Sequence, residues 1–171
     1  MELIQQKRNE YTEYIDEHVK NVKKAWGEVQ NKCHNIIVNL FNGYISTPMY
    51  MITNDIKLHD QSKYSEYEFE AYRKNFFPIS DEEKENNKED FDKAWEHHYM
   101  NNPHHWDYWW HRYQPMPTIF IIEMVCDWQA MGYKFGNNSL EYYNNNRDKI
   151  KFHNDEQARE TLEKMLHALC D

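Results

Sequence analysis

The pair His59-Asp60, with Lys63 three residues further on, is the most informative feature of this sequence. An imidazole and a carboxylate side by side at a helix end offer a nitrogen and an oxygen donor to the same small volume. This mixed donor set suits a divalent transition metal such as Mn, Fe, Co, Ni or Zn. Lys63 returns to nearly the same side of a helix as Asp60, where its ammonium group would hold a phosphate oxygen. A plain salt bridge between Asp60 and Lys63 is the structural alternative.

Further histidines lie on both sides of this pair. His97-His98 and His104-His105 are separated by a helix break at Asn102-Pro103, so the two pairs can face each other across the turn. Imidazoles are costly to bury in such a tryptophan-rich setting unless they are hydrogen-bonded or metal-bound. We therefore expect one histidine of each pair to bind metal and the other to pack or to support a ligand. The alternative is a hydrogen-bonded polar network.

Two carboxylates, Glu123 and Asp127, lie four residues apart and therefore project from one face of a helix. Residues 119–125 are mostly apolar, which predicts that this helix is buried. A buried carboxylate needs a partner, and the expected partner is a metal or a histidine. We assign Asp127 as a metal ligand and Glu123 as its support or as a general base. An ion pair with Arg112 or Lys134 is the alternative.

Composition limits the classes of protein that the chain can belong to. Its 171 residues suit one domain, and an aromatic content of 16% indicates a globular fold despite a mean hydropathy of -1.08. A net charge of -9 without a Lys- or Arg-rich block argues against an extended nucleic-acid surface. A small phosphorylated substrate remains compatible with this charge, because a bound metal reverses the local potential.

Cysteine usage and hydropathy predict the cellular setting. Cys33, Cys126 and Cys170 show no CxxC spacing, and the N-terminus has no signal-like pattern, so we expect thiols in a reducing compartment. The longest apolar stretch, around 119–125, is too short to span a bilayer. These features predict a cytoplasmic protein without a membrane segment.

The apolar spacing predicts an all-α fold of six to eight helices in a single domain, residues 1–171. Its core would cover about residues 14–135, with a helical extension at 139–171. Helices are expected at about 2–26, with His18 on or beside the apolar face, and at 91–99, 118–131 and 155–169. Gly27 and Gly132 would loosen or end two of them. Capping-box spacings at Ser65–Glu68 and Ser80–Glu83 predict two more helix starts.

The ordered series of metal-binding residue types resembles the HD superfamily of metal-dependent phosphohydrolases. His59-Asp60-Gln61-Ser62-Lys63 is similar to its HD-x-G-K form, with Ser62 in place of glycine. The resemblance implies a helical bundle whose primary metal is held by His18, His59, Asp60 and Asp127. It also implies that Lys63 contacts the substrate phosphate, and that a second metal is held by His98 and one of His104 or His105.

The chain more closely resembles an uncharacterised family found in bacteria and their phages. This resemblance spans roughly residues 14–135 and brings no established activity, although it suggests a bacterial or phage-infected cell as the setting. The segments that carry it are His59-Asp60-Gln61-Ser62-Lys63-Tyr64, Glu68-Phe69, Ala94-Trp95-Glu96-His97-His98, Asn102-Pro103-His104-His105-Trp106, Glu123-Met124 and Asp127-Trp128.

The leading hypothesis is a metal-dependent phosphohydrolase that acts on a small phosphate ester, with nucleotides among the candidates. One or two divalent ions would serve the reaction, and Asp60, Lys63 and Glu123 would be the catalytic residues. An iron-dependent oxygenase of the HD type is the first alternative. The second is a non-catalytic binding protein that sequesters a nucleotide signal or a host protein. The oligomeric state is left open.

Overall fold

A computed structural model describes all residues, 1–171, and shows ten α-helices, one 3-10 helix and no strand. The all-α prediction is confirmed, whereas the predicted count of six to eight helices is too low. One additional helix forms in the asparagine-rich segment that follows Gly136. In chain order the helices are α1 (Glu2–Lys32), α2 (His34–Leu40), α3 (Ser46–Lys57), η1 (Gln61–Tyr64), α4 (Phe69–Phe76), α5 (Asp81–Asn86), α6 (Lys88–Asn101), α7 (Trp106–Trp110), α8 (Thr118–Phe135), α9 (Ser139–Asn146) and α10 (Asp155–Cys170).

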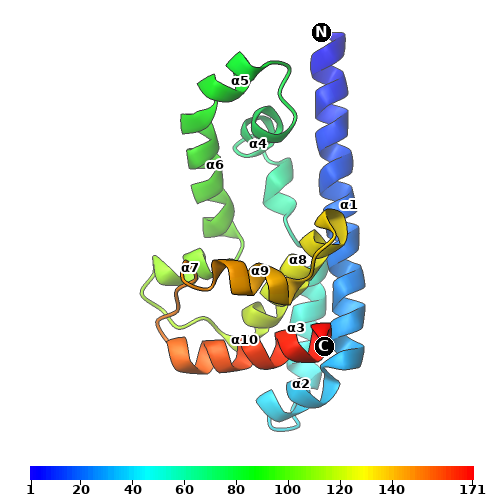
Figure 1. Ribbon diagram of the computed structural model, residues 1–171, viewed down its shortest axis with the longest axis vertical. Helices are drawn as coiled ribbons and strands as arrows, with labels where there is room; N and C mark the ends of the chain where they lie inside the picture. The colour runs from blue at the N-terminus through cyan, green and yellow to red at the C-terminus, as the bar shows by residue number, and fades with distance from the viewer.

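Helix α1 runs along nearly the whole length of the molecule (Figure 1). It extends beyond residue 26, the expected end, and continues through Gly27 to Lys32. A single interior glycine costs about 1 kcal/mol relative to alanine, and buried residues on both sides of it, such as Trp26 and Val29, anchor the helix. The buried face of α1 also carries Tyr11 and His18, which lie seven residues, or two turns, apart.

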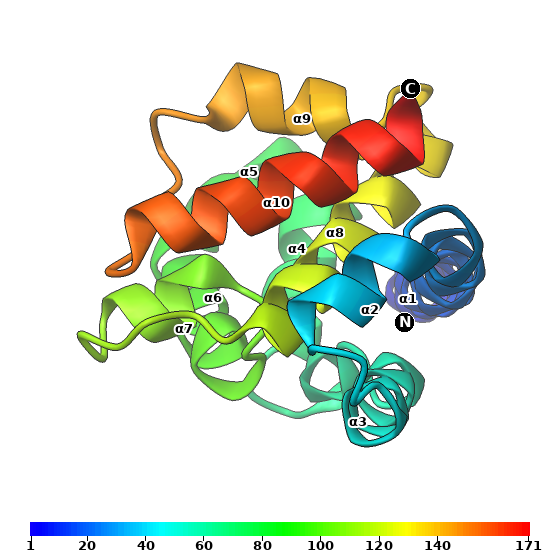
Figure 2. The same ribbon diagram turned by 90° about the horizontal axis from the view of Figure 1, so that it is seen from below.

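Helix α8 is the central element and lies among α1, α3, α9 and α10 (Figure 2). The prediction that it stops at Gly132 is wrong, because the helix continues to Phe135 and ends at Gly136, which adopts φ 76°. Gly132 has a different role: a Cβ atom there would lie 2.6 Å from the backbone oxygen of Asn137. The glycine therefore lets the chain pack closely as it leaves α8.

The apolar side chains form two clusters of unequal size. The large cluster of 24 buried residues joins the second half of α1 to α3, α8, α9 and α10. The small cluster lies between the first half of α1, α4 and α6, and its members are Tyr11, Ile15, Val19, Ala71, Tyr72 and Ala94. Helix α10 thus packs into the main core. No helix combines the length and the apolar composition that crossing a membrane would require.

The two predicted capping boxes have different outcomes. Ser80 caps α5, and its hydroxyl accepts a hydrogen bond from the Glu83 amide at 3.1 Å, as predicted. The box at Ser65–Glu68 does not form: α4 starts at Phe69 without a side-chain cap. The Glu68 side chain instead turns into the molecule, where it contacts histidines of α6.

The buried Arg73 guanidinium gives a pH-dependent contribution to stability. It donates to both carboxylate oxygens of Glu83, at 2.8 and 2.9 Å, and this pairing lowers the Glu83 pKa below its ordinary 4.5. A lowered carboxylate pKa stabilises the fold above pH 4.5, and this stabilisation is lost as the pH falls through the folded-state pKa. We expect Glu83→Gln to cost about 2 to 3 kcal/mol at pH 7.

Urea unfolding of wild type and Glu83→Gln at pH 7 and pH 3 measures this contribution. The difference between the two proteins should shrink at the lower pH. Glu89→Gln, which removes an exposed partner of Lys93, is the matched control and should not change the unfolding midpoint. A Glu83→Gln penalty of the same size at both pH values would contradict the prediction.

Candidate metal centre

Asp60 lies in the turn between α3 and η1, in the left-handed region at φ 58° and ψ 19°. This conformation is uncommon for residues other than glycine, and aspartate and asparagine tolerate it best. The Asp60 side chain is nevertheless almost completely buried, with 1% of the residue exposed. An unfavourable backbone conformation and a buried charge at the same residue point to a functional position.

One oxygen of Asp60 faces a first group of ligands. Its Oδ2 atom lies 3.3 Å from Nε2 of His18 and 3.7 Å from Nε2 of His59. Both nitrogens also approach Oδ1 of Asp127, at 3.0 Å for His18 and 3.6 Å for His59. Helices α1 and α8 and the turn after α3 therefore bring two imidazoles and two carboxylates together.

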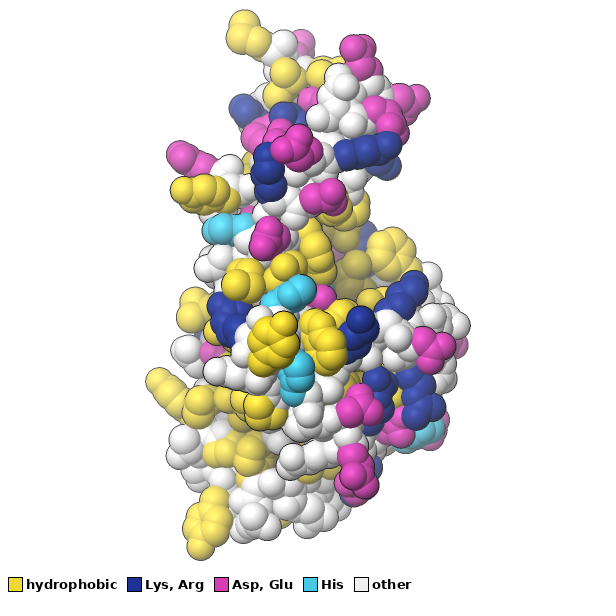
Figure 3. Space-filling model, turned by 90° about the vertical axis from the view of Figure 1, so that its left-hand side faces the viewer, with side chains coloured by type: hydrophobic (Ala, Val, Ile, Leu, Met, Phe, Trp, Pro, Cys, Tyr) yellow, Lys and Arg dark blue, Asp and Glu magenta, His cyan; other side chains and the backbone are white.

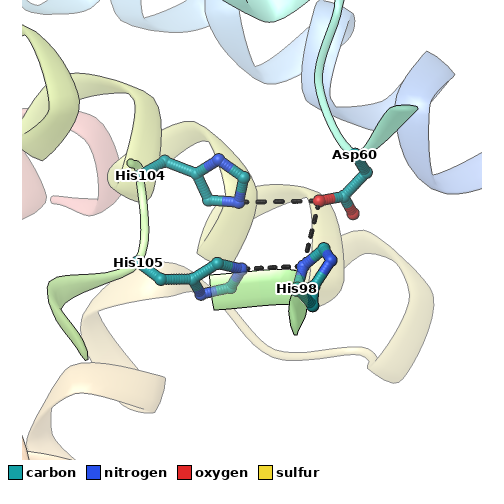
Figure 4. Close-up of side chains that lie close together, drawn as sticks. All are labelled: Asp60, His98, His104 and His105. Atoms are coloured by element: carbon teal, nitrogen blue, oxygen red, sulfur yellow. Dashed lines mark hydrogen bonds and ion pairs between the residues drawn. The ribbon is translucent and has the colours of Figure 1, made fainter. Parts of the chain in front are cut away.

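The other oxygen of Asp60 faces a second group, shown in Figure 4. Its Oδ1 atom lies 3.3 Å from Nε2 of His98 on α6 and 3.6 Å from Nε2 of His104 in the loop before α7. Nε2 of His105 lies 2.9 Å from Nε2 of His98. Potential ligand atoms of Asp60 and these three histidines all lie within 4.8 Å of one another.

Several of these atoms have no hydrogen-bond partner although they are buried. They are Nε2 of His18, Nε2 of His59, Nε2 of His104 and Oδ1 of Asp60. Buried polar atoms are rarely left unpaired, since each costs about 1 to 3 kcal/mol. A mixed set of imidazole nitrogens and carboxylate oxygens fits a divalent transition metal. The two Asp60 oxygens lie beside different histidines, while His59, His104 and Asp127 form a further potential group, so the residues present could hold one or two ions.

The opposite ring nitrogens of these histidines contact two buried glutamates. Oε1 of Glu123 lies 3.0 Å from Nδ1 of His59 and 3.3 Å from Nδ1 of His104. Glu68 lies 2.9 Å from Nδ1 of His98 and 2.7 Å from Nδ1 of His97. A carboxylate behind a histidine fixes its tautomer, so that Nε2 is free to bind a metal. Glu68 was not predicted for this role, because its spacing from Ser65 indicated a helix cap.

Helix η1 brings Ser62 and Lys63 to the same centre. Nζ of Lys63 lies 2.5 Å from Oδ2 of Asp60, so the salt bridge considered for this pair is present. The Ser62 hydroxyl lies 3.2 Å from Nδ1 of His98 and accepts a hydrogen bond from the Asn102 amide at 2.7 Å. Serine at the position where the HD-x-G-K form has glycine therefore adds a contact to His98, a potential ligand.

Neighbouring charges and burial shift the pKa values of the titratable residues in this centre. Burial opposes ionisation of His59, but neighbouring Asp60 and other carboxylates outweigh it and raise the His59 pKa to about 10. Burial likewise opposes ionisation of Glu123, yet contacts with His104 and His59 lower its pKa to about 2. Burial and neighbouring imidazoles lower the pKa of His104 and His105. His104 and His105 are therefore neutral and Glu123 is ionised, which are the states that bind metals or support metal ligands, whereas His59 holds a proton that metal binding would displace.

A cavity of about 460 Å³ adjoins the centre and is lined by His18, Asp60, Lys63, His98, His105 and Asp127. Its remaining walls are largely aromatic and include Trp95, Trp106 and Trp128. Figure 3 shows the face of the molecule that α6 and α7 occupy, where hydrophobic and histidine side chains surround a hollow. The potential ligands are therefore open to a small molecule from one side.

Comparison with known protein families matches residues 7–168 to DUF5662, a family of unknown function. The chain belongs to the DUF5662 family. This agrees with the expected uncharacterised family, and the match covers most of the chain. No curated protein and no solved structure matches the sequence.

In this DUF5662 chain, all seven residues predicted as ligands lie in one cluster. In the first histidine pair, His98 faces the centre, whereas His97 reaches only Glu68 and the ring of Tyr67. In the second pair, both His104 and His105 lie with Asp60 and His98 in one group of potential ligands, and the expectation that one histidine of the pair binds metal stays a prediction. The seven residues are His18, His59, Asp60, His98, His104, His105 and Asp127.

The carboxylates of α8 do not form the ion pairs considered as alternatives. Lys134 instead pairs with Glu17, and Arg112 lies over the ring of Tyr108. Glu123 contacts the Nδ1 atoms of His59 and His104, which lie opposite their Nε2 atoms. It is not among the residues that line the cavity. Its contacts therefore support an orienting role better than that of a general base.

Replacing Glu123 with glutamine tests this orienting role. The amide keeps the size of the side chain but cannot accept hydrogen bonds from both rings with a full negative charge. We expect the metal affinity to fall by about 10- to 100-fold, as for other carboxylates behind metal-binding histidines. Competition with a fluorescent chelator measures the affinity, and Glu163→Gln, which is remote from the centre, is the control. Unchanged affinity in Glu123→Gln would contradict the prediction.

Proposed function

We propose that this protein is a metal-dependent phosphohydrolase that acts on a small phosphate ester. The observation that carries the proposal is the position of Asp60, whose two oxygens lie beside different imidazoles next to a cavity. The resemblance of the ordered series His18, His59-Asp60 and Asp127 to the HD superfamily supports the same function. A divalent metal bound there would polarise a phosphoryl oxygen and lower the pKa of water.

The charges around the cavity support an anionic substrate. Three carboxylates line it, from Asp60, Asp107 and Asp127, together with the ammonium groups of Lys63 and Lys149. One or two divalent ions would reverse the net negative charge of this lining, so that a phosphate group is attracted. Lys63 remains protonated: although burial opposes its charge, Asp60 raises its pKa. Its ammonium group is thus placed to balance negative charge on the substrate.

The size and walls of the cavity indicate what the phosphate is attached to. Its volume of about 460 Å³ lies within the range of sites for small organic molecules. Flat aromatic walls suit an apolar or planar group, and a nucleobase is one such group. A small ester, with nucleotides among the candidates, therefore fits better than a polymer.

Metal analysis followed by an activity screen tests the proposal. The protein, prepared without a histidine tag, is analysed by inductively coupled plasma mass spectrometry and then loaded with Mn, Fe, Co, Ni or Zn. Phosphate release is measured from 4-nitrophenyl phosphate, nucleoside monophosphates and sugar phosphates. We expect metal-dependent release that a chelator prevents.

Other outcomes of this screen favour the alternatives. A loaded protein that releases phosphate from none of these esters would overturn the proposal. Bound iron together with oxygen consumption would favour the iron-dependent oxygenase. Protein that takes up no metal under any of these conditions would favour a binding protein, with the histidine cluster as a polar network of the core.

A further inference from the structure

Buried polar atoms without a partner are concentrated at this site. Nine buried side-chain nitrogen or oxygen atoms of the molecule have no hydrogen-bond partner, and six of them belong to the centre or to the cavity walls. A bound metal would account for four of the six, as described above. The two that remain are the hydroxyl oxygens of Tyr11 and Tyr72.

Both tyrosines lie where a ligand of the metal centre would be held. Tyr11 precedes His18 by two turns on the same buried face of α1, and Tyr72 comes from α4. Both residues line the cavity together with Asp60 and Lys63. Their rings are nearly parallel, with an interplanar angle of 12° and centroids 6.5 Å apart.

Tyr72 in particular contacts groups of the centre. Its ring centroid lies 5.9 Å from Nζ of Lys63, and its ring meets that of the ligand His98 edge to face, with centroids 5.8 Å apart. The ammonium group of Lys63 and the two tyrosines therefore occupy the same end of the cavity as the potential metal ligands.

Packing alone does not explain these two hydroxyl groups. Tyr11 is fully buried and Tyr72 is 4% exposed, so phenylalanine would fill the same space without leaving a polar atom unpaired. A phenol, whose ordinary pKa is about 10, keeps its proton at neutral pH and can donate a hydrogen bond. Two such donors in a cavity that the Lys63 ammonium group also lines are suited to an anion that offers several oxygen acceptors.

We propose that the hydroxyl groups of Tyr11 and Tyr72 donate hydrogen bonds to the phosphate oxygens of the substrate, beside Lys63 and the metal centre. This inference rests on the proposed phosphohydrolase function and assigns two residues that bind the transferred group. Such donors act on the oxygens where negative charge is carried during phosphoryl transfer. They also favour phosphate over an uncharged ester group.

Phosphate binding to the metal-loaded, full-length protein tests the assignment. The variants are Tyr11→Phe, Tyr72→Phe and the double substitution, each of which removes only the hydroxyl group. Isothermal titration calorimetry with inorganic phosphate measures the affinity, and metal content and melting temperature are measured in parallel. We expect each single variant to bind phosphate about tenfold more weakly, as expected for loss of a hydrogen bond to a charged group.

The melting temperature distinguishes this role from a structural one. Because the lost hydroxyl has no partner within the protein, the metal-free variants should be as stable as wild type or more stable. Tyr143→Phe is the matched control, since that hydroxyl donates to Glu163 at 2.6 Å and Tyr143 does not line the cavity. The control should lose stability and retain phosphate affinity.

Two results would overturn the inference, and they are distinguishable. If loaded wild-type protein binds phosphate and all tyrosine variants bind it equally well, the hydroxyl groups have no such role while the proposed function stands. If loaded wild-type protein neither binds phosphate nor releases it from any ester, the proposed function fails and the inference fails with it.

Discussion

Replacing Asp60 with asparagine is expected to remove metal from both groups of ligands and to abolish phosphate release. The two Asp60 oxygens face different imidazole sets, so one substitution damages both. Loss of a carboxylate that hydrogen-bonds to a metal-binding histidine lowers the metal affinity by about 10- to 100-fold. Loss of Asp60 itself, a potential ligand, should lower it further. Asparagine is preferred to alanine because it tolerates the left-handed backbone at φ 58°.

Metal content by mass spectrometry and phosphate release are the measurements for this variant, with far-UV circular dichroism to show that the helices persist. Asp107→Asn is the matched control, because Asp107 lines the same cavity but belongs to none of the ligand groups. It should retain a full complement of metal. If Asp60→Asn also retained full metal, Asp60 would not be a ligand.

Removal of metal should lower the melting temperature by about 5 to 11 °C. A ligand present at 100 times its dissociation constant stabilises a protein by about 2.7 kcal/mol, and 1 kcal/mol shifts the midpoint by about 2 to 4 °C at this size. The ligands come from α1, α6, α8 and the loops after α3 and α6, so an ion connects parts of the chain that separate on unfolding.

Differential scanning calorimetry of metal-loaded protein, with and without a chelator, measures this shift. The Asp60→Asn variant serves as the control, since its melting temperature should not respond to the chelator. Equal midpoints for the loaded and chelated wild-type protein would show that no ion bridges these segments.

The order and type of the potential ligands could be predicted from the sequence. Glu123 and Asp127 are local: their spacing on one apolar helix is sufficient to place both carboxylates on one face. His98, His104 and His105 were recognisable because four histidines are concentrated in a short, tryptophan-containing segment, where burying them is costly unless they are paired or bind metal. The all-α class followed from the same helical spacing of apolar residues.

Other features depend on contacts between distant segments and could not be predicted. Glu68 meets His97 and His98 only because α4 packs beside α6, and its local spacing indicated a cap instead. Tyr72 joins Tyr11 for the same kind of reason, through the packing of α4 on α1. The sequence alone shows the two-turn spacing that places Tyr11 and His18 on one face of a helix, but not the contact between Tyr11 and Tyr72. The end of α8 is at Gly136 and not at Gly132, whose role is to leave room for the backbone of Asn137.

The two unequal hydrophobic clusters have a consequence for how the molecule opens. The small cluster under α4 and α6 holds only six buried residues, so this lobe has less apolar burial to resist local unfolding than the core around α8. His98 belongs to this lobe, whereas Asp60, whose Oδ1 atom lies 3.3 Å from Nε2 of His98, follows α3, which packs against α8. An ion held by both residues would connect the lobe to the larger core. Local unfolding that moves α6 away from the core would then require release of the ion. The frequency of this local unfolding would therefore depend on the concentration of available metal.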